Sequence, residues 1–246
     1  MAEASASRWW PGSAPALVEL QRELAAAVAA PWRPGDRPPA VAGVFVVGPR
    51  GAAGSGRAGD PGWAAAVVLA GPRTLAVATV RGRLGAPYAP GLLALREGPL
   101  LERALRALPL VPELVLADAT GRDHPRGAGL TLHLGAVMGL PSVGVTDRPL
   151  VATAPDPGPE VGAAAELRLD GRLVGYRLRS RAGARPIVVH AGWRVSPEVA
   201  LEVVRGLLRG ARTPEPLRQA RRLARTLRAR DGSPEEAAGD GSVGAR

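Results

Sequence analysis

The stretch from Pro112 to Val145 decides the fold and reads PELVLADATGRDHPRGAGLTLHLGAVMGLPSVGV. An apolar run ends in Asp118, a polar loop carrying His124 follows, and an apolar helical segment leads to a second short apolar run. This pattern predicts two parallel strands joined by a helical crossover. Open α/β sheets place ligands and chemistry at the C-terminal ends of such strands. We therefore expect a functional site around Asp118.

The segments before this unit predict three more strands. Residues 40–47 form a nearly continuous Val-rich apolar run, as expected for a buried central strand. Residues 63–69 and 74–80 predict two further strands across a short turn, so the three form an antiparallel meander. Amphipathic helices are predicted from residue 14 onward and over 92–108. Three antiparallel strands followed by parallel strands, flanked by helices, are typical of a ribonuclease H-like mixed α/β sheet.

The segments after this unit predict a smaller appendix. Short strands are expected over 167–169, 173–178 and 186–190. Ser196 begins a helix as its N-cap, and Pro214 begins a last, Arg-rich helix.

The length of 246 residues suits one substantial domain. We expect an N-terminal arm over residues 1–13, a single domain over 14–230 and a disordered, polar tail over 231–246.

The basic charge of the chain is unevenly distributed. The net charge is +10, and all 32 basic residues are Arg. Residues 205–230 hold nine Arg against one acid, Glu215. This basic surface suits a polyanion such as nucleic acid. A solvated helix in an Arg-biased proteome explains the same charge, so both interpretations stay open.

Several classes of protein are excluded by composition. The chain has no Cys, which excludes disulfides and thiolate metal sites. No apolar run is long enough to span a membrane, and the N-terminus lacks the basic start and apolar core of a secretory signal. We expect a cytoplasmic monomer that does not bind membranes.

Two long motifs carry a resemblance to a known family. The run from Pro87 to Glu97, PYAPGLLALRE, resembles the endonuclease V family pattern PYxPGLLAFRE. The run from Pro112 to Val145 resembles that family's PDLLLVDGxGxAHPRxxGLAxHLG…LPTIGVAK. Shorter matches are Val41-Ala42-Gly43-Val44, Gly192 with Arg194, and Pro214-Glu215-Pro216. The resemblance covers residues 14–228.

The resemblance implies a ribonuclease H-like fold and a Mg²⁺-dependent nuclease, with Mn²⁺ as an alternative ion. The family cuts a phosphodiester on the 3′ side of deoxyinosine, the product of adenine deamination, and some members act on inosine in RNA. Glu97 and Asp118 match two catalytic acids that bind the metal, and His124 matches the motif histidine near the site. The implied partner is DNA containing deoxyinosine.

The resemblance also implies residues that contact the nucleic acid. Tyr88 matches the aromatic wedge that separates the strands at the lesion, although a Tyr that covers the core is the simpler interpretation of this residue. Gly91 and the loop at Gly121 match backbone elements near the extruded base, and Arg126 belongs to the same motif.

Three site residues depart from the family pattern, and the glycine-rich segment DGxG is changed to Asp118-Ala119-Thr120-Gly121. Phe45 stands where the first-strand motif VAGVD places a metal-binding Asp. Asp147 replaces the Lys of GVAK, and Trp193 replaces the histidine of SPGHR. Phe cannot bind a metal ion, and losing such a ligand costs orders of magnitude in rate.

Compensation for these losses is conceivable. Asp147 could join Glu97 and Asp118 as a third carboxylate around a metal ion, and Asp123 is a spare acid for the same site. His190 could replace the missing histidine, but its place on a strand predicts that it faces the opposite side. Three hypotheses follow: a divergent endonuclease V with a rearranged metal site, a non-catalytic nucleic-acid-binding homologue, or a decayed homologue. The missing first-strand ligand favours the second or third.

Overall fold

The computed structural model describes residues 8–49 and 54–231. Residues 1–7 of the predicted N-terminal arm and residues 232–246 of the predicted tail lie outside the described residues. Asp231, where that tail was expected to begin, is the last residue of a helix.

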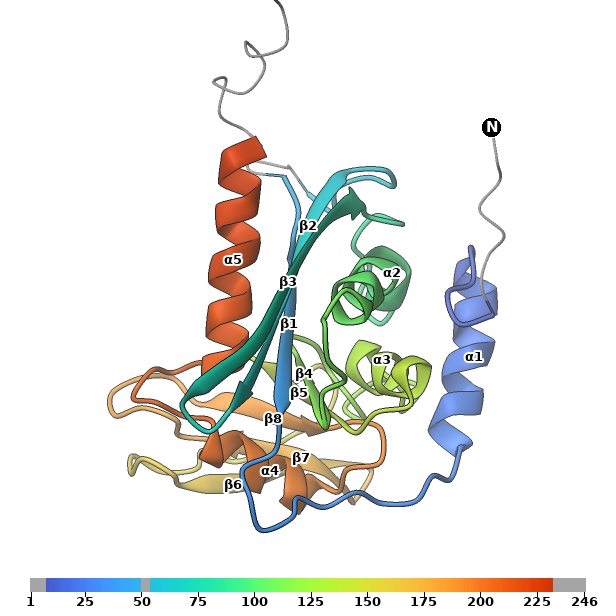
Figure 1. Ribbon diagram of the computed structural model, residues 1–246. Coiled ribbons are helices and arrows are strands. Elements are labelled where there is room, and N and C mark those ends of the chain that lie inside the picture. Colours follow the sequence, from blue (N-terminus) through green and yellow to red (C-terminus); the bar gives the residue numbers. More distant parts are fainter. Residues whose placement is uncertain (1–7, 50–53, 232–246) are drawn as a thin grey trace, which may run out of the picture.

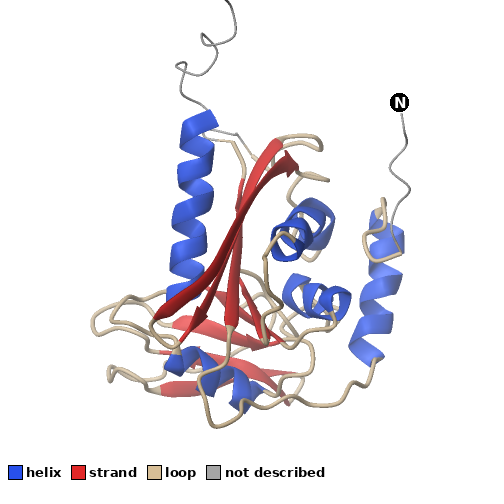
Figure 2. Ribbon diagram, in the orientation of Figure 1, coloured by secondary structure: helices blue, strands red, loops and turns tan. Residues whose placement is uncertain are grey.

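One eight-stranded mixed sheet forms the centre of the structure (Figures 1 and 2). Its strand order is β3-β2-β1-β4-β5-β8-β7-β6. The strands are β1 (Val41–Val47), β2 (Pro61–Ala70), β3 (Arg73–Arg83), β4 (Leu114–Ala117), β5 (Ser142–Thr146), β6 (Ala164–Leu169), β7 (Arg172–Leu178) and β8 (Ile187–Ala191).

The first half of the sheet has the predicted ribonuclease H-like arrangement. β2 pairs antiparallel with β1 and with β3, which forms the expected meander. β4 pairs parallel with β1 and with β5. The prediction from residues 112–145 is therefore confirmed: a short strand, a helix and a second parallel strand.

The last three strands extend the same sheet. β8 pairs antiparallel with β5, β7 with β8, and β6 with β7. The three strands were predicted, but the expectation of a smaller appendix was wrong. Local periodicity shows that a strand forms but not which strand it pairs with. The partner that joins β8 to the first half of the sheet is β5, which lies 42 to 48 residues earlier in the chain.

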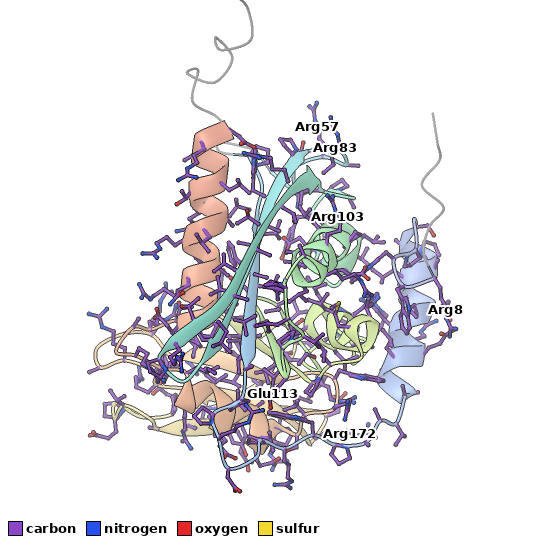
Figure 3. The ribbon with its side chains drawn as sticks, viewed as in Figure 1. Arg8, Arg57, Arg83, Arg103, Glu113 and Arg172 are labelled. Atoms are coloured by element: carbon purple, nitrogen blue, oxygen red, sulfur yellow. The ribbon has the colours of Figure 1, made fainter. Side chains whose placement is uncertain are left out.

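Helices cover both faces of the sheet (Figure 1). The helices α1 (Ala14–Ala26), α2 (Leu93–Arg106) and α3 (Leu130–Met138) lie on one side, and the Arg-rich helix α5 (Glu215–Asp231) lies on the other (Figure 1). Helix α4 spans Pro197–Gly206. Alternate residues of β1 separate the two cores: Ala42 and Val44 pack with α2 and α3, and Val41 packs with α4 and α5. Many charged side chains, such as Arg57, lie at the periphery (Figure 3).

The last helix approaches the central strand closely at Gly43. A Cβ atom on Gly43 would lie 2.3 Å from the carbonyl carbon of Pro216, so only glycine fits there. The buried residues of α5 continue this contact: Pro216, Leu217, Ala220 and Ala224. Phe45 is two residues beyond Gly43 and therefore faces the same side of the sheet, towards α5.

Candidate nuclease site

The two predicted catalytic acids line one cavity. Asp118 follows β4 directly, and Glu97 belongs to α2. Both line a cavity of about 200 Å³, together with Phe45 and Tyr88. The parallel register, whose last pair is Val44 with Ala117, places Phe45 beside Asp118. The position where the resemblance implies a third acid is thus adjacent to Asp118 and carries a phenyl ring.

A guanidinium group lies between the phenyl ring and the acid. Nη2 of Arg221 donates a hydrogen bond to Oδ2 of Asp118 at 2.8 Å. The Cζ atom of Arg221 lies 4.9 Å from the centroid of the Phe45 ring, which is a cation–π contact. Phe45 also packs against Leu223 and Ala224 of the same helix. Arg221 thus joins α5 to the end of β4.

Sequence reasoning missed the role of Arg221. The sequence shows it only as one of nine Arg in the last segment. The helical spacing could have indicated the position of Arg221. Arg221 follows Ala220 directly and precedes Ala224 by three positions, and both alanines are buried. A residue between two buried positions borders the buried face of the helix.

Burial and mutual repulsion change the charges of the two acids. Burial, and secondly the charge of Asp118, raise the pKa of Glu97 to about 8 against the opposing influence of Arg96. Burial also raises the pKa of Asp118, although Arg221 acts in the opposite direction. Glu97 therefore holds its proton in most molecules at neutral pH.

Asp147 does not join the two acids. Its side chain is 76% exposed and forms an ion pair with Arg212. The hydrogen bond from Arg212 lowers the pKa of Asp147. Asp147 lines neither the cavity of Glu97 and Asp118 nor the larger one beside it. The proposed three-carboxylate arrangement is not formed, because Asp147 turns towards solvent and a separate cation.

Asp123 is not a spare ligand either. Its buried carboxylate accepts hydrogen bonds from the backbone N–H groups of Leu150, Val151 and Ala152, at 2.8 to 2.9 Å. Asp123 therefore holds the segment after β5 in place.

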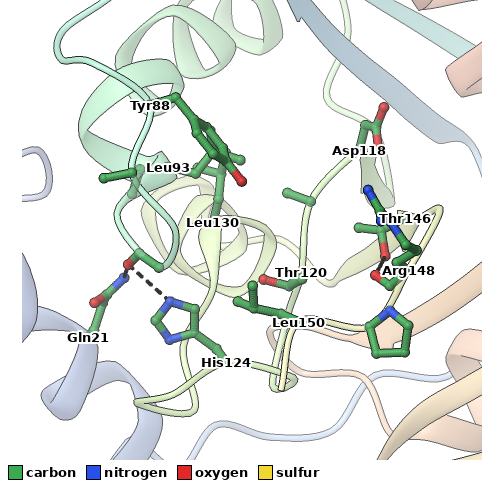
Figure 4. A pocket seen from close by; sticks show the side chains of 15 residues that line it. Gln21, Tyr88, Leu93, Asp118, Thr120, His124, Leu130, Thr146, Arg148 and Leu150 are labelled. Carbon is green, nitrogen blue, oxygen red and sulfur yellow. Dashed lines mark hydrogen bonds between the residues drawn. The ribbon is translucent and has the colours of Figure 1, made fainter. Parts of the chain in front are cut away.

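A second cavity, of about 370 Å³, lies next to the acids (Figure 4). Asp118 lines one end of it, and Tyr88 and His124 line the other. Tyr88 is 51% exposed and borders both cavities. This volume is in the range of small-ligand pockets.

Three side chains converge on the carbonyl oxygen of Gly91 beside this cavity. Gln21 donates to it at 3.1 Å and Arg126 at 2.7 Å, and His124 Nε2 lies 3.1 Å from it. Arg126 also donates to Gln21 at 2.6 Å. Arg126, predicted to contact nucleic acid, thus directs two of its donors to the protein itself.

His124 is a neutral imidazole in this arrangement. Its Nδ1 accepts a hydrogen bond from the backbone N–H of Arg126 at 3.2 Å, so Nε2 carries the proton and donates to Gly91. Burial lowers the pKa of His124 to about 4. Both ring nitrogens are engaged, which fits a positioning role.

The two predicted glycines have clear structural reasons. Gly91 has a φ of +74°, which favours glycine. A Cβ atom on Gly121 would lie 2.0 Å from the carbonyl oxygen of Ala191. Gly121 therefore lets the loop after β4 pass close to the end of β8.

Trp193 and His190 line neither cavity. Trp193 packs on a cluster from α1 and α3 that includes Leu20 and Leu132. His190 is fully buried, and its Nε2 lies 2.7 Å from the hydroxyl of Thr146. Neither side chain stands in for a site histidine here.

The donor set does not fit the divalent metal that the resemblance implies. Mg²⁺ demands a near-octahedral set of oxygen ligands and is usually held by one or two carboxylates together with waters and substrate phosphates. The cavity offers two carboxylates, Glu97 and Asp118; Asp118 is already paired with Arg221, and the cavity is also lined by Phe45, which has no oxygen ligand. Within residues 8–49 and 54–231, no group of three or more His, Cys, Asp or Glu is placed to hold a metal ion.

None of the helices in the described part of the chain is long and apolar enough to cross a membrane.

Comparison with known proteins identifies the family to which the sequence motifs and the fold correspond. The family model described as Endonuclease V matches residues 40–222. An endonuclease V of Xanthomonas campestris pv. campestris is 40% identical over 217 residues, covering 87% of this chain and 89% of that protein. The crystal structure of the Streptomyces avermitilis endonuclease V superposes with a TM-score of 0.80 at 37% identity, covering 91% of this chain and 96% of that one.

A more distant relative was solved with nucleic acid. The endonuclease V of Ciona intestinalis, 21% identical with a TM-score of 0.72, is in complex with a 24mer DNA containing an inosine followed by a ribo-adenosine. The match covers 87% of this chain and 96% of that one.

Proposed function

Because this chain belongs to the endonuclease V family, we propose that it binds inosine-containing DNA and that its metal-dependent cleavage of the phosphodiester is impaired or lost. The family reaction implied by the resemblance is Mg²⁺-dependent hydrolysis on the 3′ side of deoxyinosine. The observation that carries the proposal is the phenyl ring of Phe45 beside Asp118.

A phenyl ring at this position removes both a ligand and a charge. A divalent ion polarises the scissile phosphate and activates the attacking water, which requires oxygen ligands that hold the ion in place. Removing one stabilising group from an active site costs about two to three orders of magnitude in rate. Phe45 supplies no oxygen ligand, and Asp147 does not replace it because its side chain is turned to solvent.

The binding half of the proposal is supported by the second cavity. Tyr88 is half-exposed at its border, and an exposed ring can stack on a base. The cavity of about 370 Å³ is of the size that small planar ligands occupy. The Ciona relative binds DNA that contains an inosine. Arg218, Arg222 and Arg225 line a surface depression of α5 together with Arg221, and so add positive charge to the helix that contacts Asp118.

Two measurements on one substrate test the proposal. A labelled duplex with a single inosine and the matched duplex without it are incubated with the protein, with Mg²⁺ or Mn²⁺ present. Fluorescence anisotropy should show tighter binding to the inosine duplex, while denaturing gels show little or no nick. A rapid metal-dependent nick that Asp118→Ala abolishes would identify a divergent enzyme instead. Equal, weak binding to both duplexes at low salt would favour the decayed homologue.

A further inference from the structure

We infer that the guanidinium of Arg221 takes the place of the divalent cation at this site, so that nucleic acid is bound there without a metal ion. The inference rests on the proposed function for its ligand, but its claim about the metal can be tested without nucleic acid. It starts from the position of Arg221 between Asp118 and Phe45.

Asp118 and Phe45, the two neighbours of Arg221, both stabilise a single positive charge. Asp118 accepts a charge-assisted hydrogen bond of 2.8 Å from Nη2. The Phe45 ring presents its negative π-face to the guanidinium at 4.9 Å. An Asp at position 45 would instead offer a second carboxylate, which suits a divalent ion. The aromatic ring and the guanidinium therefore form a matched pair.

The fold holds Arg221 at this position. Gly43 lets the start of α5 approach β1 closely, and Leu217 and Ala220 bury the helix face next to Arg221. The Nε atom of Arg221 is buried and has no hydrogen-bond partner. A buried donor without a partner is unfavourable, so the contacts with Asp118 and Phe45 must outweigh this cost.

Arg221 forms its ion pair with Asp118, and two other acids close in the chain to the site have partners of their own. Asp147 is paired with Arg212. Asp123 receives three backbone hydrogen bonds. Arg221 thus stays paired with Asp118 rather than with either of these acids.

Replacing a divalent ion by the guanidinium of Arg221 keeps the binding of phosphate but removes the hydrolysis of the phosphodiester. A guanidinium can donate hydrogen bonds to phosphate oxygens, and a chelator cannot remove it. It does not generate a hydroxide nucleophile as a bound divalent ion does. The side chain of Arg221 is 31% exposed, so part of it remains accessible to a phosphate. The site therefore keeps positive charge for binding and lacks the activation of water.

The metal claim is tested with four proteins in the absence of nucleic acid. They are the parent chain, Phe45→Asp, Arg221→Met and the double variant of both. Titration with Mn²⁺, followed by the electron paramagnetic resonance signal of the free ion, should detect a bound ion only in the double variant. In Phe45→Asp alone, Arg221 would pair with the new carboxylate and still exclude the ion. Arg221→Met alone leaves Glu97 and Asp118 without a third carboxylate, so it should not bind the ion either.

A matched control excludes a simple effect of net charge. Phe45→Asp combined with Arg222→Met has the same formal charge as the double variant but keeps Arg221, and should not bind Mn²⁺. Circular dichroism confirms that each variant is folded, and Arg221→Gln replaces Arg221→Met if the Met variant unfolds. Mn²⁺ binding by the parent chain, or equal binding by Phe45→Asp alone, would overturn the inference.

The binding claim is tested with the inosine duplex in EDTA and in Mg²⁺. The parent chain should bind equally in both, and Arg221→Met should weaken binding about tenfold in both. Binding by the parent chain that is lost in EDTA would overturn the inference. If the parent chain binds no duplex under either condition, the proposed function fails and the binding claim fails with it, while the Mn²⁺ result still decides the metal claim independently.

Discussion

The buried imidazole of His124 donates a hydrogen bond from Nε2 to the carbonyl oxygen of Gly91 at 3.1 Å. Gly91 ends the Pro-rich loop that begins at Pro87 and carries Tyr88, and its carbonyl also accepts from Gln21 and Arg126. Through this oxygen, the loop after β4 holds the loop before α2. The motif histidine thus fixes a backbone position beside the cavity that Tyr88 borders.

Replacing His124 should therefore weaken binding through the loop. His124→Leu removes one buried hydrogen bond and leaves the other donors in place, so we expect about tenfold weaker binding of the inosine duplex, which corresponds to about 1.4 kcal/mol. His124→Gln can keep a donor near the Nε2 position and should retain most of the affinity. Fluorescence anisotropy on both variants measures the effect, and equal affinities would argue against the positioning role.

Tyr88 should determine the preference for inosine. Tyr88→Ala removes the ring at the border of both cavities, and a lost base–aromatic stack costs about 1–3 kcal/mol. The ratio of affinities for the inosine and control duplexes should then fall towards one. Tyr88→Phe keeps the ring and should keep the ratio. If Tyr88→Ala binds both duplexes as the parent chain does, Tyr88 only covers the core.

Gly43 should be intolerant of any side chain. In Gly43→Ala the new Cβ atom would lie 2.3 Å from the backbone of Pro216, so α5 must move away from β1. Overpacking of this kind costs about 1–3 kcal/mol, and urea unfolding measures it. Gly206→Ala is the matched control: its Cβ atom meets nothing within 4 Å and it lies in the last turn of α4, so it should leave the stability unchanged or raise it by up to about 1 kcal/mol. A neutral Gly43→Ala would mean that α5 is not held at this distance.

The ion pair of Asp118 and Arg221 should stabilise the fold modestly. Both side chains are 31% exposed, and partly exposed pairs contribute about 1 kcal/mol or less. A double-mutant cycle with Asp118→Asn and Arg221→Met, measured by urea unfolding, should give a coupling of this size. A coupling of zero would show that the contact does not persist in solution.

His133 should make the fold sensitive to acid. The ring stacks on Trp10 with centroids 4.4 Å apart, and Nε2 bonds the carbonyl of Trp9 at 2.6 Å. Its Nδ1 is buried without a partner, so a second proton there would be uncompensated. Burial lowers the pKa of His133 from 6.5 to about 4.

The direction of this pH effect follows from the lowered pKa. The unfolded chain binds more protons than the folded one between pH 4 and 6.5, so the free energy of unfolding falls as the pH drops through this window. The contribution of His133 is fully present above its unfolded pKa and amounts to about 3 kcal/mol for the fall in pKa from 6.5 to about 4. His133→Leu should flatten the dependence relative to the parent chain, in which His124 and His190 also have lowered pKa values. Urea unfolding at pH 7 and pH 4.5 measures the change.

The sequence by itself determined the order of the elements and half of the site. Apolar runs, turns and helical spacing are local signals, and they predicted β1 to β5 with their meander and parallel crossover. Because parallel strands end at one edge of the sheet, Asp118 was predicted to lie at a functional edge, and the family motif predicted Glu97 near it. Both acids line one cavity.

Only the tertiary structure decided how the charges of the site are paired. Arg221 and Asp118 are 103 positions apart, and Arg212 and Asp147 are 65 apart. Such contacts depend on how α5 packs on β1 and on which direction each side chain takes, and no local pattern encodes either one. The sequence therefore revealed that Phe45 replaces a carboxylate. Packing decided that the guanidinium of Arg221, from the last helix, lies over that ring. Two groups that the fold brings together can be far apart in the chain, so no local sequence pattern marks their contact.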